Sequence, residues 1–298
     1  MSPGAAPSRR PAPGAFLLLA GLSLVWGLNW PIMKTALATI PPLPFRALCL
    51  IPAGPTLLAI ASLRHERWRL PAREVAPLLL ASLFNVTLWY LLSAYALSLM
   101  PAGRASILAY TMPAWATLFG ALALHEPLSR RGVVGLALGM SGIAVLLVPD
   151  FHRVLAAPLG ALAMLSAAAA WAAGSVVMKR FSWTPPVIAL TGWQLTLGGL
   201  PVVLAGILIG PFPGLDHVDL AGLGGLVYVV VFGMLFAQWA WFKVLGQLPV
   251  AVASLGTLAI PVIGVLSSTF LLGETLGASE ATALALVVAA LALVLGRR

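Results

Sequence analysis

Polar and aromatic side chains interrupt several long apolar stretches of this sequence. Ser106, Tyr110 and Pro113 follow one another at intervals of three or four residues, which places them on one face of a helix. A second set with the same kind of spacing comprises Ser254, Thr257 and Pro261. A hydroxyl group that faced lipid would lack a hydrogen-bond partner, so such residues are expected to face a protein interior. Side chains of these types can hold a small molecule by hydrogen bonds and aromatic contact.

Amide, hydroxyl and aromatic residues elsewhere in the apolar stretches extend this candidate binding site. The candidate binding residues are Asn29, Trp30, Asn85, Trp89, Tyr90, Tyr110, Trp171, Ser175, Gln238, Trp239, Ser254 and Thr257. An aromatic cavity with few charges suits a ligand that has an apolar side chain, and aromatic faces also attract an ammonium group. Two other interpretations stay open, since tryptophans gather at membrane interfaces and small residues allow close helix packing.

Three prolines inside apolar stretches are candidate hinges or gates: Pro31, Pro113 and Pro261. A proline inside a helix removes one hydrogen bond and displaces the carbonyl four residues earlier. Pro113 and Pro261 are therefore predicted to free the carbonyls of Ala109 and Thr257 within continuous helices. The freed carbonyls could contact a ligand's ammonium group or mark a structural kink.

Composition defines the class of protein that carries these residues. Of the 298 residues, 61% are hydrophobic and 8% are charged, and the mean hydropathy is +1.02. This composition predicts an all-α integral membrane protein, because apolar runs of about 20 residues match the thickness of a bilayer. The sequence predicts ten spanning helices, at about 16–37, 43–63, 75–98, 102–124, 132–149, 159–179, 186–209, 220–245, 250–272 and 277–296.

The two halves of the chain repeat one pattern. Pro101, Ser106, Pro113 and Glu126 recur as Pro249, Ser254, Pro261 and Glu274, each pair at the same offset (249 − 101 = 274 − 126 = 148). Five helices per copy is an odd number, so the second copy is expected to enter the membrane from the opposite face as an inverted repeat. The expected organisation is a disordered tail over 1–14, a first five-helix repeat over 15–149, a connecting loop over 150–158 and a second repeat over 159–298.

Lysine and arginine positions predict the orientation of the chain in the membrane. Most of the 17 basic residues fall in loops on one side, which predicts a multi-pass protein of the cell (inner or plasma) membrane with both termini cytoplasmic. The net charge of +9 therefore needs no nucleic acid as a partner. The expected partners are the lipid bilayer and a small-molecule substrate, and we expect a monomer.

Catalytic, metal and nucleotide-binding patterns are missing from the sequence. The eight carboxylates and four histidines fall in loops or at helix ends, and no phosphate-binding glycine loop is present. We therefore predict no catalytic residues, no metal, no cofactor and no ATP. A membrane-embedded lipid-modifying enzyme would need acid–base pairs, and the adjacent His125 and Glu126 fit a helix end better. Arg46, Lys34 and Lys243 are expected near membrane edges, which disfavours a sugar-phosphate carrier.

These residues resemble those of a known family. The repeated helices, the Trp26–Trp30 stretch, Arg46 early in the second span and the turn at 101–105 resemble the drug/metabolite transporter superfamily. Within it the chain is similar to EamA-type members, and most similar to the YddG-type exporters of aromatic and other amino acids. The resemblance implies a central cavity and export of small metabolites by alternating access, with amino acids as the expected substrates. Drugs, nucleotide sugars or sugar phosphates are the alternative substrates within the superfamily.

Overall fold

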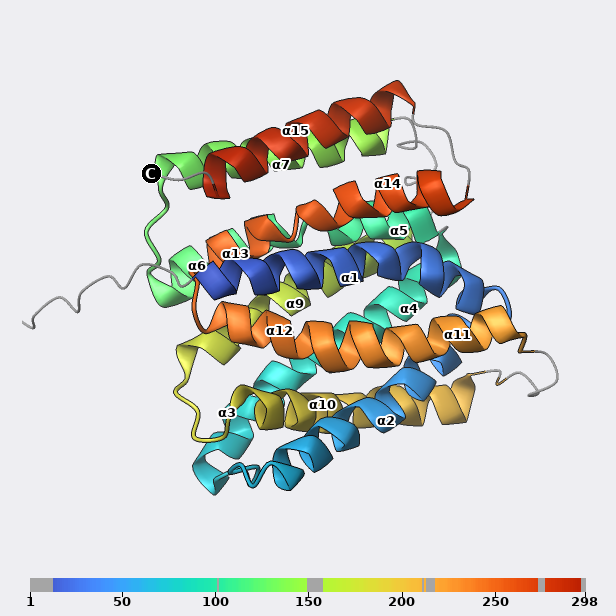
Figure 1. Cartoon of the computed structure of the whole chain (residues 1–298), viewed down its shortest axis with the longest axis vertical. Helices are drawn as coiled ribbons and strands as arrows, with labels where there is room; N and C mark the ends of the chain where they lie inside the picture. Colours follow the sequence, from blue (N-terminus) through green and yellow to red (C-terminus); the bar gives the residue numbers. More distant parts are fainter. Residues whose placement is uncertain are drawn as a thin grey trace, which may run out of the picture.

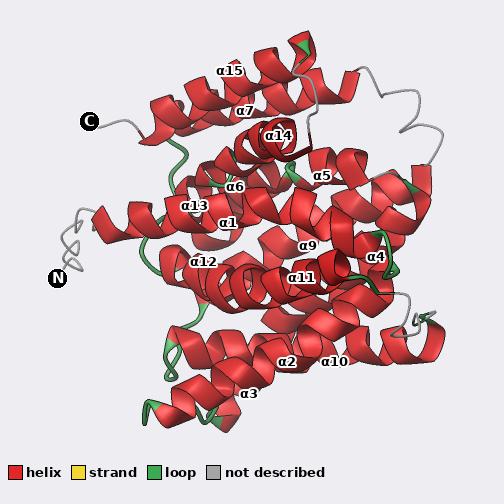
Figure 2. Cartoon of the chain, turned by 45° about the vertical axis from the view of Figure 1, so that its right-hand side comes forward, coloured by secondary structure: helices red, strands yellow, loops and turns green. Residues whose placement is uncertain are grey.

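The computed structural model describes residues 13–100, 102–148, 158–210, 212, 218–272 and 277–295. All regular structure in these ranges is helical (Figure 2), so the all-α prediction is confirmed. The predicted tail over 1–14 and the loop over 150–158 fall almost entirely outside the described residues, as do Pro101 and Glu274. The first helix begins at Pro13, slightly before its predicted start.

Helices of the first half follow the predicted order of spans (Figure 1). Their bounds are α1 (Pro13–Leu37), α2 (Pro42–Leu63), α3 (Ala72–Ser82), η1 (Leu83–Leu88), α4 (Trp89–Leu99), α5 (Ala102–Ala109), α6 (Met112–Leu124) and α7 (Arg130–Leu147). The segments α3, η1 and α4 form one long helix, whose middle turns have π-helical hydrogen bonding. Single π-helical turns within α-helices often accompany functional sites.

Helices of the second half follow the same order. Their bounds are α9 (Pro158–Arg180), α10 (Val187–Ile209), α11 (Leu220–Tyr228), η4 (Val229–Phe236), α12 (Ala237–Leu245), α13 (Val250–Gly256), α14 (Ala259–Leu272) and α15 (Ala278–Leu295). The π-helical segment η4 interrupts the long helix from α11 to α12, as η1 interrupts the corresponding helix of the first half. The two halves therefore share a local irregularity as well as a helix order.

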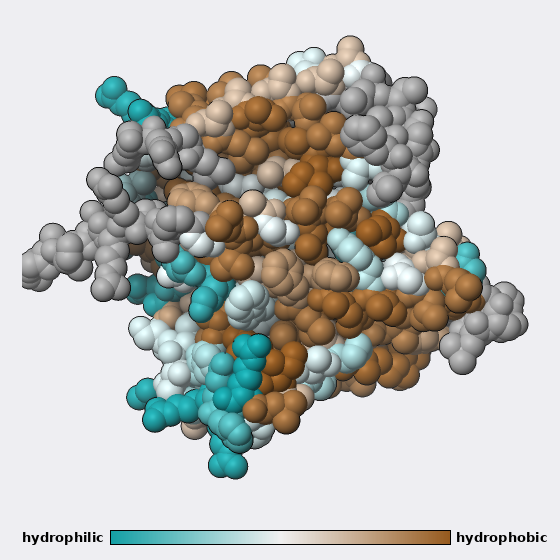
Figure 3. Space-filling view, in the orientation of Figure 1, coloured by the Kyte–Doolittle hydropathy of each residue, from teal (hydrophilic) through white to brown (hydrophobic). Residues whose placement is uncertain are grey.

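Length and hydropathy identify membrane-spanning helices within the described residues. Eight helices are long and apolar enough to cross a bilayer, from Gly14–Leu37 to Leu220–Leu245. Two shorter apolar helices, Val250–Gly264 and Ala281–Val294, occupy the ninth and tenth predicted spans. Leucines such as Leu17 and Leu208 leave about three quarters of their surface exposed, and the space-filling view shows broad apolar sides (Figure 3). The chain is an integral membrane protein.

Helix pairs from different halves pack together throughout the structure. The helix α2 packs along α10, α7 packs along α15, and α1 packs along α14. The helix α9 is the most buried of the long helices, with 61% of its spanning window inside the protein. A close approach holds α2 to α10, since a β-carbon added at Gly54 would lie 2.6 Å from the backbone nitrogen of Thr196. This arrangement brings the faces that carry the candidate residues together.

Pro113 and Pro261 were predicted to kink continuous helices. This prediction was wrong, because the helix is broken just before each of them. The fourth predicted span is broken at Tyr110 and Thr111, and Pro113 lies in the first turn of α6. The ninth is broken at Thr257 and Leu258, and Pro261 lies in the first turn of α14. A proline is tolerated in a first turn, where its missing N–H would have no helical partner. Pro31 lies inside an unbroken α1.

Candidate functional site

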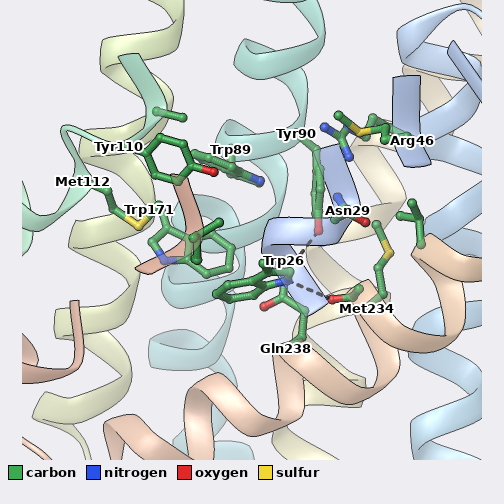
Figure 4. A pocket seen from close by; sticks show the side chains of 15 residues that line it. Trp26, Asn29, Arg46, Trp89, Tyr90, Tyr110, Met112, Trp171, Met234 and Gln238 are labelled. Carbon is green, nitrogen blue, oxygen red and sulfur yellow. Dashed lines mark hydrogen bonds between the residues drawn. The ribbon is translucent and has the colours of Figure 1, made fainter. Parts of the chain in front are cut away.

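A cavity of about 100 Å³ lies in the middle of the helix bundle, between the two halves. One water needs ~10–15 Å³ by this kind of measure, so the cavity has room for a small molecule. Figure 4 shows the side chains that surround it. The lining residues are Trp26, Asn29, Met33, Arg46, Trp89, Tyr90, Ala109, Tyr110, Met112, Trp171, Val229, Gly233, Met234, Gln238 and Ile260.

Tryptophans form the aromatic wall of this cavity. The Trp171 ring centroid is 5.8 Å from that of Trp26 in an edge-to-face arrangement and 5.3 Å from that of Trp89. Trp241 closes the group from behind, 6.2 Å from both Trp26 and Trp171. Edge-to-face and tilted aromatic pairs are favourable beyond the area they bury. The group therefore gives the cavity a firm wall that can pack against an apolar ligand.

Hydrogen bonds join the two halves around the cavity. Gln238 Nε2 donates to Tyr90 Oη at 3.2 Å, and both side chains are buried. Trp26 Nε1 donates to the Gly233 carbonyl at 3.2 Å. This carbonyl lies within η4, where the π-helical turn changes the ordinary hydrogen bonding of the backbone. Two polar contacts on the cavity wall thus connect one half of the chain to the other.

Asn85 and Ser175 lie behind the wall rather than on the cavity surface. Asn85 Nδ2 donates to the Trp171 carbonyl at 2.8 Å, and Ser175 Oγ donates to the same carbonyl at 3.0 Å. Trp241 Nε1 in turn donates to Ser175 Oγ at 3.3 Å. Both residues are fully buried. Their position indicates that they hold Trp171 and Trp241 in place and do not touch a ligand in this conformation.

The remaining candidate residues are placed as follows. Ser254 Oγ donates to the Val250 carbonyl, and Thr257 Oγ1 donates to the Ser254 carbonyl at 2.6 Å, so both bond within their own chain segment and do not line the cavity. Trp239 packs against Phe236, with ring centroids 6.3 Å apart, and also lies off the cavity. The side chain of Trp30 is outside the described part of the structure. Asn29, Trp89, Tyr90, Tyr110, Trp171 and Gln238 do line the cavity.

Arg46 is the main residue that the sequence argument missed. It was predicted near a membrane edge with access to water, whereas the side chain is only 7% exposed and lines the cavity. The guanidinium carbon lies 5.1 Å from the Tyr90 ring centroid and 5.7 Å from that of Phe45. Arg46 and Gln194 stand 148 positions apart, and this shared offset of two polar residues in apolar helices was the available signal. Trp26, Met33, Met112 and Met234 were also missed, because apolar side chains look like packing.

Metal and acid–base chemistry have few candidate groups around the cavity. Among the residues that the structure describes, no three His, Cys, Asp or Glu side chains gather closely enough to hold a metal ion. The carboxylate of Glu126 follows a helix that ends at Leu124, as the sequence predicted, with His125 in a left-handed conformation (φ 53°). The cavity offers hydrogen bonds, one guanidinium and aromatic faces, which suit reversible binding of a small molecule.

Together the fold and the cavity define a helical membrane protein with a binding space between two similar halves. The chain belongs to the EamA-like transporter family, which matches it twice, over residues 13–148 and 158–296. It is therefore a membrane transporter and not an enzyme.

Comparisons with individual proteins agree with this family. The chain is 32% identical over 279 residues to the uncharacterized transporter YvbV of Bacillus subtilis, covering 93% of this chain and 90% of the relative. It is 28% identical to a probable amino-acid metabolite efflux pump of Salmonella typhimurium, covering 90% of each chain. The Escherichia coli protein with the same description is 26% identical and covers 85% of each chain. A solved crystal structure shares the fold, with a TM-score of 0.79 and 23% identity over 96% of this chain and 99% of that chain.

Proposed function

We propose that this chain is a secondary transporter that exports small metabolites, chiefly amino acids including aromatic ones, by alternating access. The observation that carries this proposal is the cavity, because its lining comes from both copies of the family unit and lies among membrane-spanning helices. A site shared by two similar halves can face either side when one half moves against the other. No ATP is needed for such a movement, since the substrate's own gradient can drive it.

Helix directions support an inverted relationship between the two copies. Leu19, near the start of α1, contacts Gly256 in α13. Lys179, near the end of α9, donates a hydrogen bond to the Leu248 carbonyl just before α13. The start of α1 and the end of α9 therefore lie at the same end of the bundle (Figure 1). Since α1 and α9 are the first helices of their copies, the copies run through the membrane in opposite directions.

Contacts between helices at that end of the bundle support the proposal that the cavity is closed on that side. Glu126 accepts hydrogen bonds from the Val250 backbone N–H at 2.9 and 3.2 Å from its two oxygens. Its carboxylate also pairs with Lys179 Nζ at 3.0 Å. These contacts join the end of α6, the start of α13 and the end of α9, which come from both copies. They can break when the halves move and so open this side.

Charge distribution supports a cytoplasmic assignment for this end. Exposed basic residues lie in its loops and helix ends: Arg64, Arg67, Arg69, Arg73, Arg130, Arg131, Arg180 and Lys243. Figure 3 shows hydrophilic residues gathered toward this end of the molecule. Such a bias favours a cytoplasmic location, here in the cell membrane, with both chain ends on that side. A single chain contains the whole cavity lining, so a monomer is sufficient for transport.

The substrate proposal rests on the wall of the cavity and on relatives. Trp26, Trp89 and Trp171 offer aromatic faces for an apolar side chain or an ammonium group. Two relatives are described as probable amino-acid metabolite efflux pumps. An aromatic wall also accommodates other small metabolites that have an apolar group.

Counterflow in proteoliposomes tests this function directly. Purified protein would be reconstituted into liposomes loaded with one unlabelled metabolite, and uptake of the labelled form would be followed. We expect counterflow with phenylalanine, tryptophan or an aliphatic amino acid, and none in protein-free liposomes. Trp171→Ala should reduce the rate, while Lys243→Gln, an exposed residue away from the cavity, should not. Counterflow of sugar phosphates or nucleotide sugars without any amino acid would contradict the proposed substrates.

A further inference from the structure

Arg46 is a buried cation on the wall of the candidate cavity. It lies about one turn into α2, and only 7% of its surface is exposed. A charged group in the interior of a membrane protein carries a large desolvation cost, and such groups are usually paired or functional. The group that neutralises this guanidinium therefore bears on the function of the cavity.

Protein carboxylates do not supply that partner within the described residues. No described carboxylate oxygen lies within 4.0 Å of Arg46, whereas Glu74 and Glu126 each pair with another cation. The described structure also gives the Arg46 side chain no hydrogen bond. Its neighbours are the aromatic rings of Tyr90 and Phe45. These rings attract a cation through their faces but do not neutralise its charge.

The guanidinium geometry favours a planar anion. A guanidinium has five N–H groups in a rigid fork, which matches a carboxylate in a bidentate contact. The guanidinium carbon lies over the face of the Tyr90 ring, 5.1 Å from its centroid, and a guanidinium packed against a ring can still direct N–H groups to a ligand. Figure 4 shows the Arg46 guanidinium close to Tyr90 and Asn29, at the edge of the cavity. A ligand carboxylate in the cavity can reach it.

The other end of the cavity is apolar. In Figure 4, Trp171, Met112 and Tyr110 lie on the side away from Arg46, with Trp26 and Trp89 between. Methionine and aromatic side chains accommodate apolar groups of varied shape. The cavity thus has a cationic end and an aromatic end, which suits a ligand with a carboxylate and an apolar body.

We propose that Arg46 binds the carboxylate of the substrate and selects small monocarboxylates that have an apolar or aromatic body. This inference rests on the proposed transport function and assigns the substrate class of the same cavity. Among the described lining residues Arg46 is the one cation, which matches a monoanion better than a phosphate dianion. The equivalent position of the other copy holds Gln194, so the cationic end exists in one copy only. A bound ligand therefore has one orientation in the cavity.

A binding experiment on the full chain in detergent tests this assignment. Ligand binding would be followed by quenching of tryptophan fluorescence, because three tryptophans line the cavity. The probes are 3-phenylpropanoate, its neutral amide 3-phenylpropanamide, and phenyl phosphate. The variants are Arg46→Gln, which has the residue type of the other copy, Arg46→Lys, and the exposed control Lys243→Gln.

We expect a preference for the carboxylate over the amide, and we expect this preference to disappear when the guanidinium is removed. The unmodified chain and Lys243→Gln should bind the carboxylate about tenfold or more tighter than the amide, as expected for a charge-assisted hydrogen bond. Arg46→Gln should bind both equally, and its retained amide binding would show that the cavity is intact. Arg46→Lys should keep part of the preference, since it keeps the charge without the planar fork.

The assignment would be overturned by equal binding of carboxylate and amide by the unmodified chain, by an unchanged preference in Arg46→Gln, or by tighter binding of phenyl phosphate than of the carboxylate. Loss of amide binding in Arg46→Gln would also count against a role confined to the carboxylate. Failure of the transport function looks different. In that case no amino acid would show counterflow, although the Arg46-dependent preference in binding would persist.

Discussion

Tyr90 and Gln238 occupy equivalent positions in the two copies, and their side chains are hydrogen-bonded to each other. They are 148 residues apart, which is the offset that relates the copies, and Gln238 Nε2 lies 3.2 Å from Tyr90 Oη. Under the proposed two-fold relationship between the copies, two equivalent residues touch only close to the axis that relates them. Trp26 in α1 and Trp171 in α9, the first helices of the two copies, are 145 positions apart and are also in contact, with ring centroids 5.8 Å apart. The cavity therefore lies where the two copies meet.

The Tyr90–Gln238 contact gives the first prediction. Tyr90→Phe keeps the ring next to Arg46 but removes the hydroxyl, and Gln238→Leu removes the donor. Each change should slow amino-acid counterflow by about twofold to tenfold, because one buried hydrogen bond contributes roughly 1 kcal/mol. The double variant should be no slower than the slower single variant, since both changes remove the same bond. Additive losses in a complete double-mutant cycle would show that the residues act separately.

Packing between Asn85 and Gly174 gives the second prediction. A β-carbon at Gly174 would lie 2.5 to 2.7 Å from the three outer atoms of the Asn85 amide. Gly174→Ala should therefore displace Asn85 from the Trp171 carbonyl, reduce ligand quenching of tryptophan fluorescence and lower the melting temperature. Asn85→Ala made in the Gly174→Ala chain should recover part of the melting temperature, because the clash is gone. If the double variant were less stable than Gly174→Ala, Asn85 would not be the group in conflict.

Glu126 provides the third prediction, which concerns the proposed cytoplasmic side. Glu126→Gln keeps an oxygen for the Val250 N–H but loses the charge that pairs with Lys179. The closed arrangement should lose about 1 kcal/mol, roughly a fivefold change in population, because the pair is partly exposed. A cysteine at Ala253, a fully buried residue of α13 near Val250, in a Cys49→Ala chain should then react faster with a thiol reagent. An unchanged reaction rate would mean that this ion pair does not hold the closed state.

Helix packing gives the fourth prediction, on stability. A β-carbon at Gly54 would meet backbone atoms of α10, including the Gly192 carbonyl at 2.9 Å. Gly54→Ala should therefore destabilise the protein by about 2 kcal/mol, as overpacking does elsewhere. Gly224→Ala is the matched control, because it also lies within a helix and nothing lies within 4 Å of the added carbon. Equal melting temperatures for the two variants in detergent would contradict the packing of α2 on α10.

Some features were predictable because they depend on repeated, local patterns. Long apolar runs predict helices. The offset between Pro113 and Pro261 predicts that the chain has similar local structure near both prolines. The structure has a break close to both prolines. The nature of the break was not predictable from the prolines alone, because a proline is compatible with either an interior kink or a first helical turn.

Site residues were harder to predict than helices, since burial depends on long-range packing. Asn85 and Tyr90 lie five residues apart in adjoining segments, yet Tyr90 lines the cavity and Asn85 lies behind Trp171. Asn85 lies within the π-helical segment η1, which ends two residues before Tyr90 and shifts the usual helix periodicity, and no local pattern revealed this shift. Arg46 also shows that long-range packing decides burial. Its position near the start of a helix indicated a place at the membrane edge, but packing against Tyr90 buries the side chain.

Alternating access to the cavity is the central claim, and accessibility of one lining position from both sides tests it most directly. Met112 lines the cavity, so Met112→Cys in a Cys49→Ala chain would place one thiol there. A charged, membrane-impermeant thiol reagent would be applied to right-side-out and inside-out vesicles, with and without phenylalanine. We predict modification from both sides, with phenylalanine changing the two rates in a linked way. Modification from one side alone under every condition would contradict a shared cavity that opens to each compartment in turn.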